Sequence, residues 1–311
     1  MKILASRVFP GPAWEELGDV ELLDGPLLDA LGDGRPEVEA LAIVAERIDD
    51  RVLDLLPSLR VVANYGVGYD DIDVAACARR GVAVTNTPGV LDAATADLAF
   101  ALVLVVRRRI VEADTFVRSG RWHGGWAQPG LLGDDVAGET LGIVGLGRIG
   151  RAVARRARAF DMRILYARRH RLAVAEEREL EVEYRPLDDL LAEADVVTLH
   201  VPLTEETQSL IDARRLALMR PGTCLVNTAR GQVVDEEALV DALVAGRLRA
   251  GLDVFAHEPQ VPRPLLDLPN VVLTPHIASA TAATREAMTR VLVDNLLAAR
   301  DGQELPNPVY P

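Results

Sequence analysis

Glu139 to Gly150 reads E-T-L-G-I-V-G-L-G-R-I-G, and this stretch decides the fold of the chain. Its apolar run from Leu141 to Val144 predicts a short buried strand. A helix is predicted next, from Arg148 to Phe160, because apolar residues recur on one face of it and arginines cover the other. The apolar face consists of Ile149, Val153, Ala157 and Phe160. The stretch therefore predicts a strand, a tight turn and a helix in succession.

The turn between this strand and helix carries glycines in the spacing G-x-G-x-x-G, at Gly145, Gly147 and Gly150. In that context the first glycine makes the tight turn and the second lets the backbone approach a pyrophosphate. The third lets the helix pack on the strand. The phosphates would lie on unpaired amides at the start of the helix, at Arg148 and Ile149. An ordinary glycine-rich turn is the alternative, and the position between a strand and a helix favours a dinucleotide site.

The residues after the next strand indicate which dinucleotide to expect. Arg163 to Ala167 predicts that strand, and NAD sites carry an acidic residue about 20 positions after the first glycine. This chain has Arg168 and Arg169 there, and no Asp or Glu occurs between Met162 and Ala175. Guanidinium groups attract the 2′-phosphate of NADP, whereas a carboxylate repels it. We therefore expect NADP(H) in preference to NAD(H); a solvated basic loop is the alternative.

Composition excludes several classes of protein. The chain has 311 residues, enough for two domains, and its net charge of −13 argues against a nucleic-acid partner. No apolar run approaches the ~20 residues of a membrane span, and the two cysteines, Cys77 and Cys224, suit a cytoplasmic protein. Lys2 is the only lysine, which excludes Schiff-base and P-loop chemistry further along the chain. No motif indicates a metal site.

The first part of the chain alternates short apolar runs with helical patterns. Strands are expected at Ile3–Leu4, Leu41–Val44, Val61–Ala63 and Val82–Val84. Helices or loops are expected at Ala13–Leu31, Asp50–Leu56 and Ile72–Arg80. Such alternation predicts parallel strands joined by crossover helices. The glycine-rich loop from Asn64 to Asp70 can hold a carboxylate on its backbone amides, and a plain strand–helix connection is equally compatible with it.

The remaining elements surround the dinucleotide stretch. A long helical pattern runs from Asp92 to Val117 with a break near Arg107–Arg109, and the polar, aromatic segment from Arg118 to Trp126 follows. That segment either caps a site, meets another subunit or forms a surface loop. Later strands are expected at Asp195–His200, Cys224–Asn227, Ala250–Val254 and Val271–Leu273, and later helices at Asp235–Ala245 and Thr281–Arg300.

Three residues with catalytic potential come just after predicted strands: Arg230, Glu258 and His276. Open parallel sheets bind ligands beyond the carboxyl ends of their strands. Arginine can bind the carboxylate and carbonyl of a 2-oxo acid, histidine can transfer a proton, and a neighbouring carboxylate can orient it. Singly, they also suit a surface ion pair, a loop charge and a core histidine, but their shared position favours hydride-transfer chemistry. The other histidines receive no catalytic role: His123, His170, His200 and His257.

Six motifs spread over essentially the whole chain carry a family resemblance. They are A-N-Y-G-V-G-Y-D-D-I-D (63–73), T-N-T-P-G-V-L-D-A-A-T-A-D-L-A (85–99), G-L-G-R-I-G (145–150), V-N-T-A-R-G-Q-V-V-D (226–235), G-L-D-V-F (251–255) and T-P-H-I-A-S-A-T (274–281). Together they resemble the D-isomer-specific 2-hydroxyacid dehydrogenases, and within them the glyoxylate/hydroxypyruvate reductases. The resemblance implies hydride transfer from NADPH to C2 of glyoxylate or hydroxypyruvate, giving a D-2-hydroxy acid.

The resemblance also assigns roles to particular residues. Arg230, Glu258 and His276 would form the family's catalytic set, with His276 as proton donor. The amides of Val67 and Gly68 would hold the substrate carboxylate. Cofactor contacts are expected from Gly145, Gly147, Arg148, Ile149, Gly150, Arg168, Arg169, Pro202, Thr228 and Asp253, the last to the nicotinamide amide. Two departures from the family pattern are Arg168, where NAD-using members carry Asp, and Ala278, where Gly is commoner.

An architecture follows from the same resemblance. It comprises two doubly wound α/β parallel-sheet domains with the active site in a cleft between them. Residues 1–97 plus 284–311 would form a flavodoxin-like substrate domain, and residues 98–283 a Rossmann cofactor domain, with hinges near Asp97 and Ala283. A homodimer is expected through the cofactor domains, with Trp126 a candidate to reach the neighbouring active site. Alternatives are another D-2-hydroxyacid dehydrogenase, of phosphoglycerate, lactate or phosphite type, and a non-catalytic NAD(P)(H)-sensing scaffold.

Overall fold

The computed structural model describes residues 1–125 and 129–311, which form two compact units. Unit 1 comprises Met1–Leu91 and Ser279–Pro311, and unit 2 comprises Asp92–Ala278. The expected boundaries at positions 97 and 283 lie slightly later, inside helices α4 (Asp92–Arg107) and α11 (Ala282–Arg300). A helix packs as one body, so the chain divides before each helix begins. Trp126, expected near a neighbouring subunit, lies outside the described residues.

Unit 1 is built on one sheet, with strand order β13-β5-β4-β3-β1-β2. The strands are β1 (Ile3–Ala5), β2 (Val20–Leu22), β3 (Ala40–Ile43), β4 (Val61–Asn64), β5 (Ala83–Thr85) and β13 (Pro308–Val309). The helices are η1 (Pro12–Leu17), α1 (Leu27–Leu31), α2 (Asp50–Asp54), α3 (Val74–Arg79) and α11. All pairs are parallel except β13 with β5. The parallel strands have the flavodoxin-like order, which confirms the expected fold class of this unit.

The interpretation of Ala13–Leu31 as one helical or loop segment is wrong. The segment contains η1, β2 and α1, and Val20 of β2 pairs with Ile3 of β1. Two glycines interrupt any helix here, because Gly18 has φ 75° and Gly25 has φ 104°. A three-residue strand is too short to show alternation in the sequence.

Unit 2 holds a second, fully parallel sheet with strand order β12-β11-β10-β9-β6-β7-β8. The strands are β6 (Thr140–Val144), β7 (Arg163–Ala167), β8 (Glu183–Tyr184), β9 (Val196–Leu199), β10 (Cys224–Asn227), β11 (Arg249–Leu252) and β12 (Val271–Leu273). The helices are α4, α5 (Ile110–Arg118), η2 (Pro129–Leu131), α6 (Arg148–Arg158), α7 (Val174–Leu180), α8 (Leu187–Glu193), α9 (Ala213–Leu218), η3 (Gly231–Val233), α10 (Glu236–Val244) and η4 (Arg263–Asp267). The order reverses between β6 and β9, as in a Rossmann domain, which confirms the second fold prediction.

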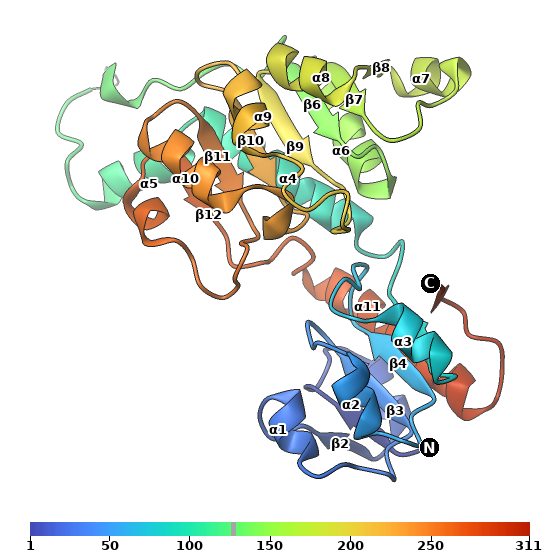
Figure 1. Cartoon of the computed structure of the whole chain (residues 1–311). Coiled ribbons are helices and arrows are strands. Elements are labelled where there is room, and N and C mark those ends of the chain that lie inside the picture. Colours follow the sequence, from blue (N-terminus) through green and yellow to red (C-terminus); the bar gives the residue numbers. More distant parts are fainter. Residues whose placement is uncertain (126–128) are drawn as a thin grey trace. The chain divides into compact units, whose positions relative to one another are not determined.

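Each face of this sheet has its own hydrophobic core. Helices α4 and α6 cover one face, where Leu141 and Ile143 of β6 are buried with Phe100 of α4. Helices α8, α9 and α10 lie on the other side, where Leu165 and Leu225 are buried (Figure 1). Side chains alternate across a strand, so strands covered on both faces read as continuous apolar runs.

The helix predicted from Asp92 to Val117 is broken as expected. Helix α4 ends at Arg107 and α5 begins at Ile110, with Arg109 between them in the left-handed region at φ 53°.

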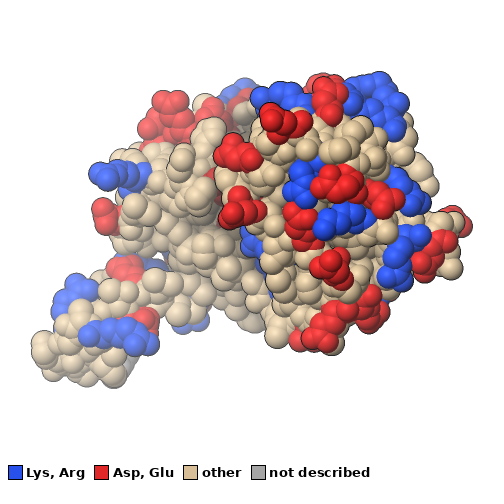
Figure 2. Space-filling model, turned by 90° about the horizontal axis from the view of Figure 1, so that it is seen from below, with Lys and Arg blue, Asp and Glu red and all other residues tan. Residues whose placement is uncertain are grey.

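No helix among the described residues is both long and apolar enough to cross a bilayer. Basic and acidic side chains intermingle on the face drawn in Figure 2.

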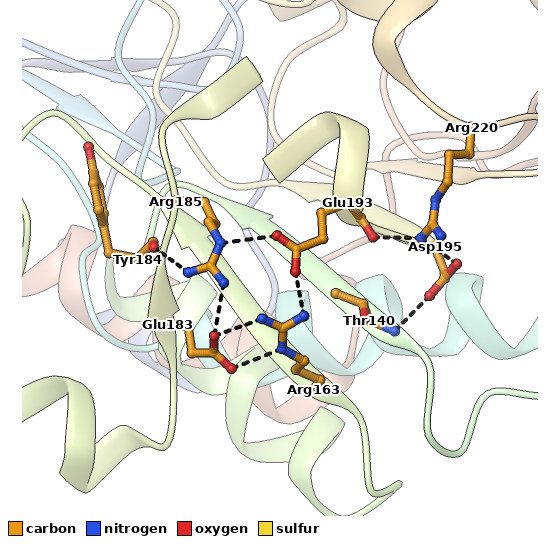
Figure 3. Close-up of polar contacts among 8 residues, drawn as sticks. All are labelled: Thr140, Arg163, Glu183, Tyr184, Arg185, Glu193, Asp195 and Arg220. Atoms are coloured by element: carbon orange, nitrogen blue, oxygen red, sulfur yellow. Dashed lines mark hydrogen bonds and ion pairs between the residues drawn. The ribbon is translucent and has the colours of Figure 1, made fainter. Parts of the chain in front are cut away.

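Alternating charges form a closed ring that ties β7, β8 and α8 together (Figure 3). Arg163 Nε donates to Glu183 Oε1 at 2.9 Å, and its Nη1 donates to Glu193. Arg185 closes the ring, with 3.1 Å to Glu183 Oε2 and 3.0 Å to Glu193 Oε2. Isolated exposed pairs contribute little, whereas a network of several charges can stabilise a fold. The ring therefore anchors the start of β7, and Arg168 and Arg169 follow the other end of this strand.

Candidate active site

The sequence-predicted residues of unit 2 gather at one edge of its sheet. Parallel strands end at the same edge, so the residues that follow them lie together. Along that edge, Gly145 follows β6, Arg168 follows β7, Pro202 comes after β9, Thr228 and Arg230 follow β10, Asp253 follows β11 and His276 comes after β12. The switch in strand order lies within this row, between β6 and β9.

The glycine turn after β6 has the geometry of a dinucleotide-binding turn. Gly145 has φ 96°, and a Cβ on it would lie 2.5 Å from the carbonyl oxygen of His200. A Cβ on Gly150 would lie 2.3 Å from the carbonyl oxygen of Gly145, so only glycine lets α6 start this close to the strand. Around Gly147 a Cβ would meet nothing within 4 Å. The turn and the packing thus require two glycines, while the third opens the backbone to a ligand.

A second observation fits a dinucleotide at this edge. The hydroxyl of Thr228 is buried, and no described residue forms a hydrogen bond with it. A buried hydroxyl without a partner costs free energy, and a bound ligand can supply the missing partner. Together with the open approach to Gly147 and the amides that start the 11-residue helix α6, the residues present fit a dinucleotide cofactor.

The arginines after β7 differ in their partners. Arg169 pairs with Glu206, and Arg171 Nε donates to Glu177 Oε1 at 2.7 Å. Hydrogen bonds from Arg171 and Tyr166 lower the pKa of Glu177 to about 2. No carboxylate in the described part of the chain pairs with Arg168, which is exposed. Arg168 is therefore the guanidinium of this loop that is available to an anionic ligand.

Two of the three catalytic candidates, His276 and Glu258, are directly paired. His276 Nδ1 lies 2.7 Å from Glu258 Oε2, and the Phe255 N–H donates to Glu258 Oε1 at 3.0 Å. Burial acts to raise the pKa of Glu258, but these hydrogen bonds and the charges of His276 and Arg230 outweigh it and lower that pKa. Glu258 is thus ionised at neutral pH and accepts from Nδ1, which leaves Nε2 of His276 for proton transfer.

Asp253 holds the backbone that carries His276. His276 has φ 54°, an unfavourable conformation for a residue with a Cβ. Its N–H donates to the carbonyl oxygen of Asp253 at 2.9 Å. The buried Asp253 carboxylate accepts from Thr274 Oγ1 at 2.6 Å, from the Ile277 N–H at 2.8 Å and from the Ala278 N–H at 2.9 Å. Ala278 contributes only its backbone here, so the departure from glycine leaves the loop intact.

Arg230 is held both at its backbone and at its guanidinium group. Asn227 Nδ2 donates to the Arg230 carbonyl oxygen at 2.8 Å, and Arg230 Nη1 donates to the Ala229 carbonyl oxygen at 2.8 Å. A Cβ on Gly231 would lie 1.9 Å from the carbonyl carbon of Phe255, so this loop and the Glu258 loop pack backbone to backbone. Sequence reasoning missed Asn227 and Gly231, although a glycine directly after the candidate arginine was the available signal.

In unit 1, the candidate substrate amides lie on the loop after β4. Val67 and Gly68 are half-buried, and no described residue accepts a hydrogen bond from either N–H. Two successive N–H groups without internal partners suit an anion.

None of the remaining histidines pairs with a carboxylate in the described part of the chain. His200 Nε2 lies 2.9 Å from Thr198 Oγ1, and burial lowers the pKa of His200 to about 3, so this ring stays neutral. His123, His170 and His257 are exposed.

Comparisons with known proteins agree with this geometry. The family model for the NAD binding domain of D-isomer specific 2-hydroxyacid dehydrogenases matches residues 100–278. A glyoxylate reductase of Thermococcus gammatolerans is 52% identical over 278 residues, which are 88% of this chain and 83% of that protein. One from Pyrococcus furiosus is 51% identical over 306 residues, 97% of this chain and 89% of that protein.

A solved structure has the same fold as this chain. The crystal structure of an NADPH-dependent glyoxylate/hydroxypyruvate reductase from Sinorhizobium meliloti, in complex with NADP and malonate, matches with a TM-score of 0.90 and 39% identity. The match covers 99% of this chain and 96% of that one. The chain belongs to the D-isomer-specific 2-hydroxyacid dehydrogenase family, which confirms the resemblance seen in its motifs.

Proposed function

We propose that this protein is an NADPH-preferring reductase that converts small 2-oxo acids, glyoxylate and hydroxypyruvate, to D-2-hydroxy acids. The observation that carries the proposal is the pairing of His276 with an ionised Glu258 at 2.7 Å, on the sheet edge that also carries the dinucleotide turn. The curated relatives named glyoxylate reductase support the substrate class. A homodimer stays a prediction.

The residues divide the chemistry between them. A bound nicotinamide would supply the hydride for C2 of the substrate. His276 would donate the proton on Nε2 to the former carbonyl oxygen, while Glu258 holds Nδ1 and keeps the ring oriented. Arg230 would bind the substrate carboxylate and polarise the carbonyl through its fixed guanidinium. In unit 1, the amides of Val67 and Gly68 would bind the carboxylate.

Preference for NADPH is proposed from the loop after β7. Arg168 follows the strand where an acidic residue would select NAD, and it has no carboxylate partner among the described residues. The Sinorhizobium meliloti neighbour is described as NADPH-dependent. Arg169 would assist once its pair with Glu206 opens, and Pro202, Thr228 and Asp253 would contact the cofactor from the neighbouring strand ends.

Replacing Arg230 tests the catalytic assignment. Arg230→Ala should lower kcat/KM on glyoxylate by about 100- to 1,000-fold, or ~3–4 kcal/mol, the order seen when a preorganised donor to the developing oxyanion is lost. Arg230→Lys should recover little, because lysine cannot present the planar guanidinium fork.

Arg178→Ala is the matched control, since Arg178 is exposed on α7 and has no ion-pair partner among the described residues. The measurement is initial rate, with thermal melting to confirm folding. Near-normal kcat/KM of folded Arg230→Ala on every 2-oxo acid would reject the role given to Arg230.

A further inference from the structure

The loop after β4 turns three consecutive carbonyl groups into unit 1. The Gly66 oxygen accepts from the Thr87 N–H at 2.9 Å and from Asn64 Nδ2 at 3.3 Å. Asn86 Nδ2 donates to the Val67 oxygen at 2.9 Å, and Asn64 Nδ2 donates to the Gly68 oxygen at 2.7 Å. Two side-chain amides and one backbone N–H therefore fix the orientation of three successive peptide groups.

Fixing the carbonyls also fixes the N–H groups. In a trans peptide the C=O of one residue and the N–H of the next are coplanar and point in opposite directions. With the Gly66 carbonyl held inward, the Val67 N–H faces outward, and the bond from Asn86 to the Val67 carbonyl turns the Gly68 N–H outward. No described residue accepts from either N–H. The loop thus presents the Val67 and Gly68 N–H groups as a preorganised pair of donors, while its carbonyl oxygens already accept hydrogen bonds from the protein.

We propose that Asn64 and Asn86 are positioning residues that aim the Val67 and Gly68 amides at the carboxylate of the 2-oxo acid. This inference rests on the proposed function. Neither asparagine touches the substrate; each acts through the carbonyl that it holds. An amide is required at both positions because a carboxylate accepts hydrogen bonds and would repel these carbonyl oxygens. Preorganisation matters because a peptide group that was free to rotate would lose conformational entropy on binding the anion, which would weaken the binding.

Asn86→Asp tests this inference with little change in shape. Asn86 is half-buried, whereas Asn64 is 5% exposed and its replacement endangers the fold. We expect KM for glyoxylate, and the inhibition constant of oxamate, to rise about tenfold, as on loss of one hydrogen bond to a charged group. The dissociation constant of NADPH and the melting temperature should stay near wild type. Asn86→Gln, which keeps the donor, should recover part of the affinity.

Asn307→Asp is the control for the added charge. Asn307 is also half-buried, its carbonyl oxygen accepts from the Asn86 N–H at 3.3 Å, and its side chain donates to none of the loop carbonyls. The Asn307→Asp variant should have the KM for glyoxylate and the inhibition constant of oxamate of the wild type. Equal losses in Asn86→Asp and Asn307→Asp, or unchanged KM and oxamate inhibition in folded Asn86→Asp, would overturn the inference. A wild-type chain that fails to reduce glyoxylate would instead contradict the proposed function, and direct titration with oxamate would then decide the inference alone.

Discussion

His276 illustrates how much depends on single residues. Its ring is aligned by Glu258, and its left-handed backbone is held by Asp253, a buried carboxylate with three donors. The catalytic candidates could be predicted from sequence because each is a reactive residue just after a strand. The hydrogen bonds from the His276 loop to the Asp253 carboxylate could not be predicted, because Asp253 and Ala278 are distant in sequence and meet only in the folded chain. The predicted contact of Asp253 with the nicotinamide amide stays a prediction.

Asp253→Asn should separate positioning from stability. The new NH2 group would face backbone N–H donors, so at least one hydrogen bond of the His276 loop is lost, at a cost of about 1–3 kcal/mol. We expect kcat/KM on glyoxylate to fall tenfold or more, with a smaller change in the dissociation constant of NADPH. Steady-state kinetics and cofactor titration measure both. Unchanged kcat/KM in a folded variant would show that catalysis does not need these hydrogen bonds of Asp253.

At the scale of elements, the sequence indicated most of the strands and the turn that matter for the site. Strands β6, β7, β9, β10, β11 and β12 all lie where apolar runs predicted them. The expected helix end at Phe160 is too late, since α6 stops at Arg158 and Phe160 is 40% exposed. Strands β8 and β13 have two residues each, too few for any periodic signal. Their pairing depends on neighbours far away in the sequence.

Alanine substitutions of the two glycines at the start of α6 should have different effects, one on cofactor affinity and the other on stability. Gly147→Ala places its Cβ in open space, so the melting temperature should hold while NADPH binds about tenfold more weakly. Gly150→Ala puts a Cβ 2.3 Å from the Gly145 oxygen, and overpacking of this kind costs about 1–3 kcal/mol of stability. Thermal melting and cofactor titration of both variants form a matched test. Wild-type cofactor affinity in Gly147→Ala would contradict a close approach of the pyrophosphate.

Charge acts on the whole molecule. With a net charge of −13, an anionic substrate would need local donors, the role that we propose for Arg230 and the amides of Val67 and Gly68. Some of the acidic side chains are nonetheless paired with arginines in unit 2. Hydrogen bonds from Arg214 and Arg215 lower the pKa of Asp188 to about 2, and Glu177 is held similarly by Arg171 and Tyr166.

Acid should therefore destabilise unit 2 in a way that can be traced to Glu177. Its folded pKa of about 2 lies below the ordinary value of about 4.3, so its stabilisation is complete above that value and is lost as pH falls toward 2. Glu177→Gln should lower the melting temperature at pH 7 and show a smaller further loss on acidification than wild type. Glu179→Gln, an exposed neighbour on the same helix, is the control. Equal acid sensitivity of all three proteins would exclude this role for Glu177.

The most direct test is initial rate, followed by loss of absorbance at 340 nm. Glyoxylate and hydroxypyruvate are each supplied with NADPH and with NADH, for wild type and for Arg168→Asp. We expect wild type to reduce both acids faster with NADPH, and Arg168→Asp to shift the preference toward NADH. An unchanged NADPH/NADH ratio in Arg168→Asp would reject the role of that loop. No turnover of either acid with either cofactor, despite tight cofactor binding, would contradict the reductase itself.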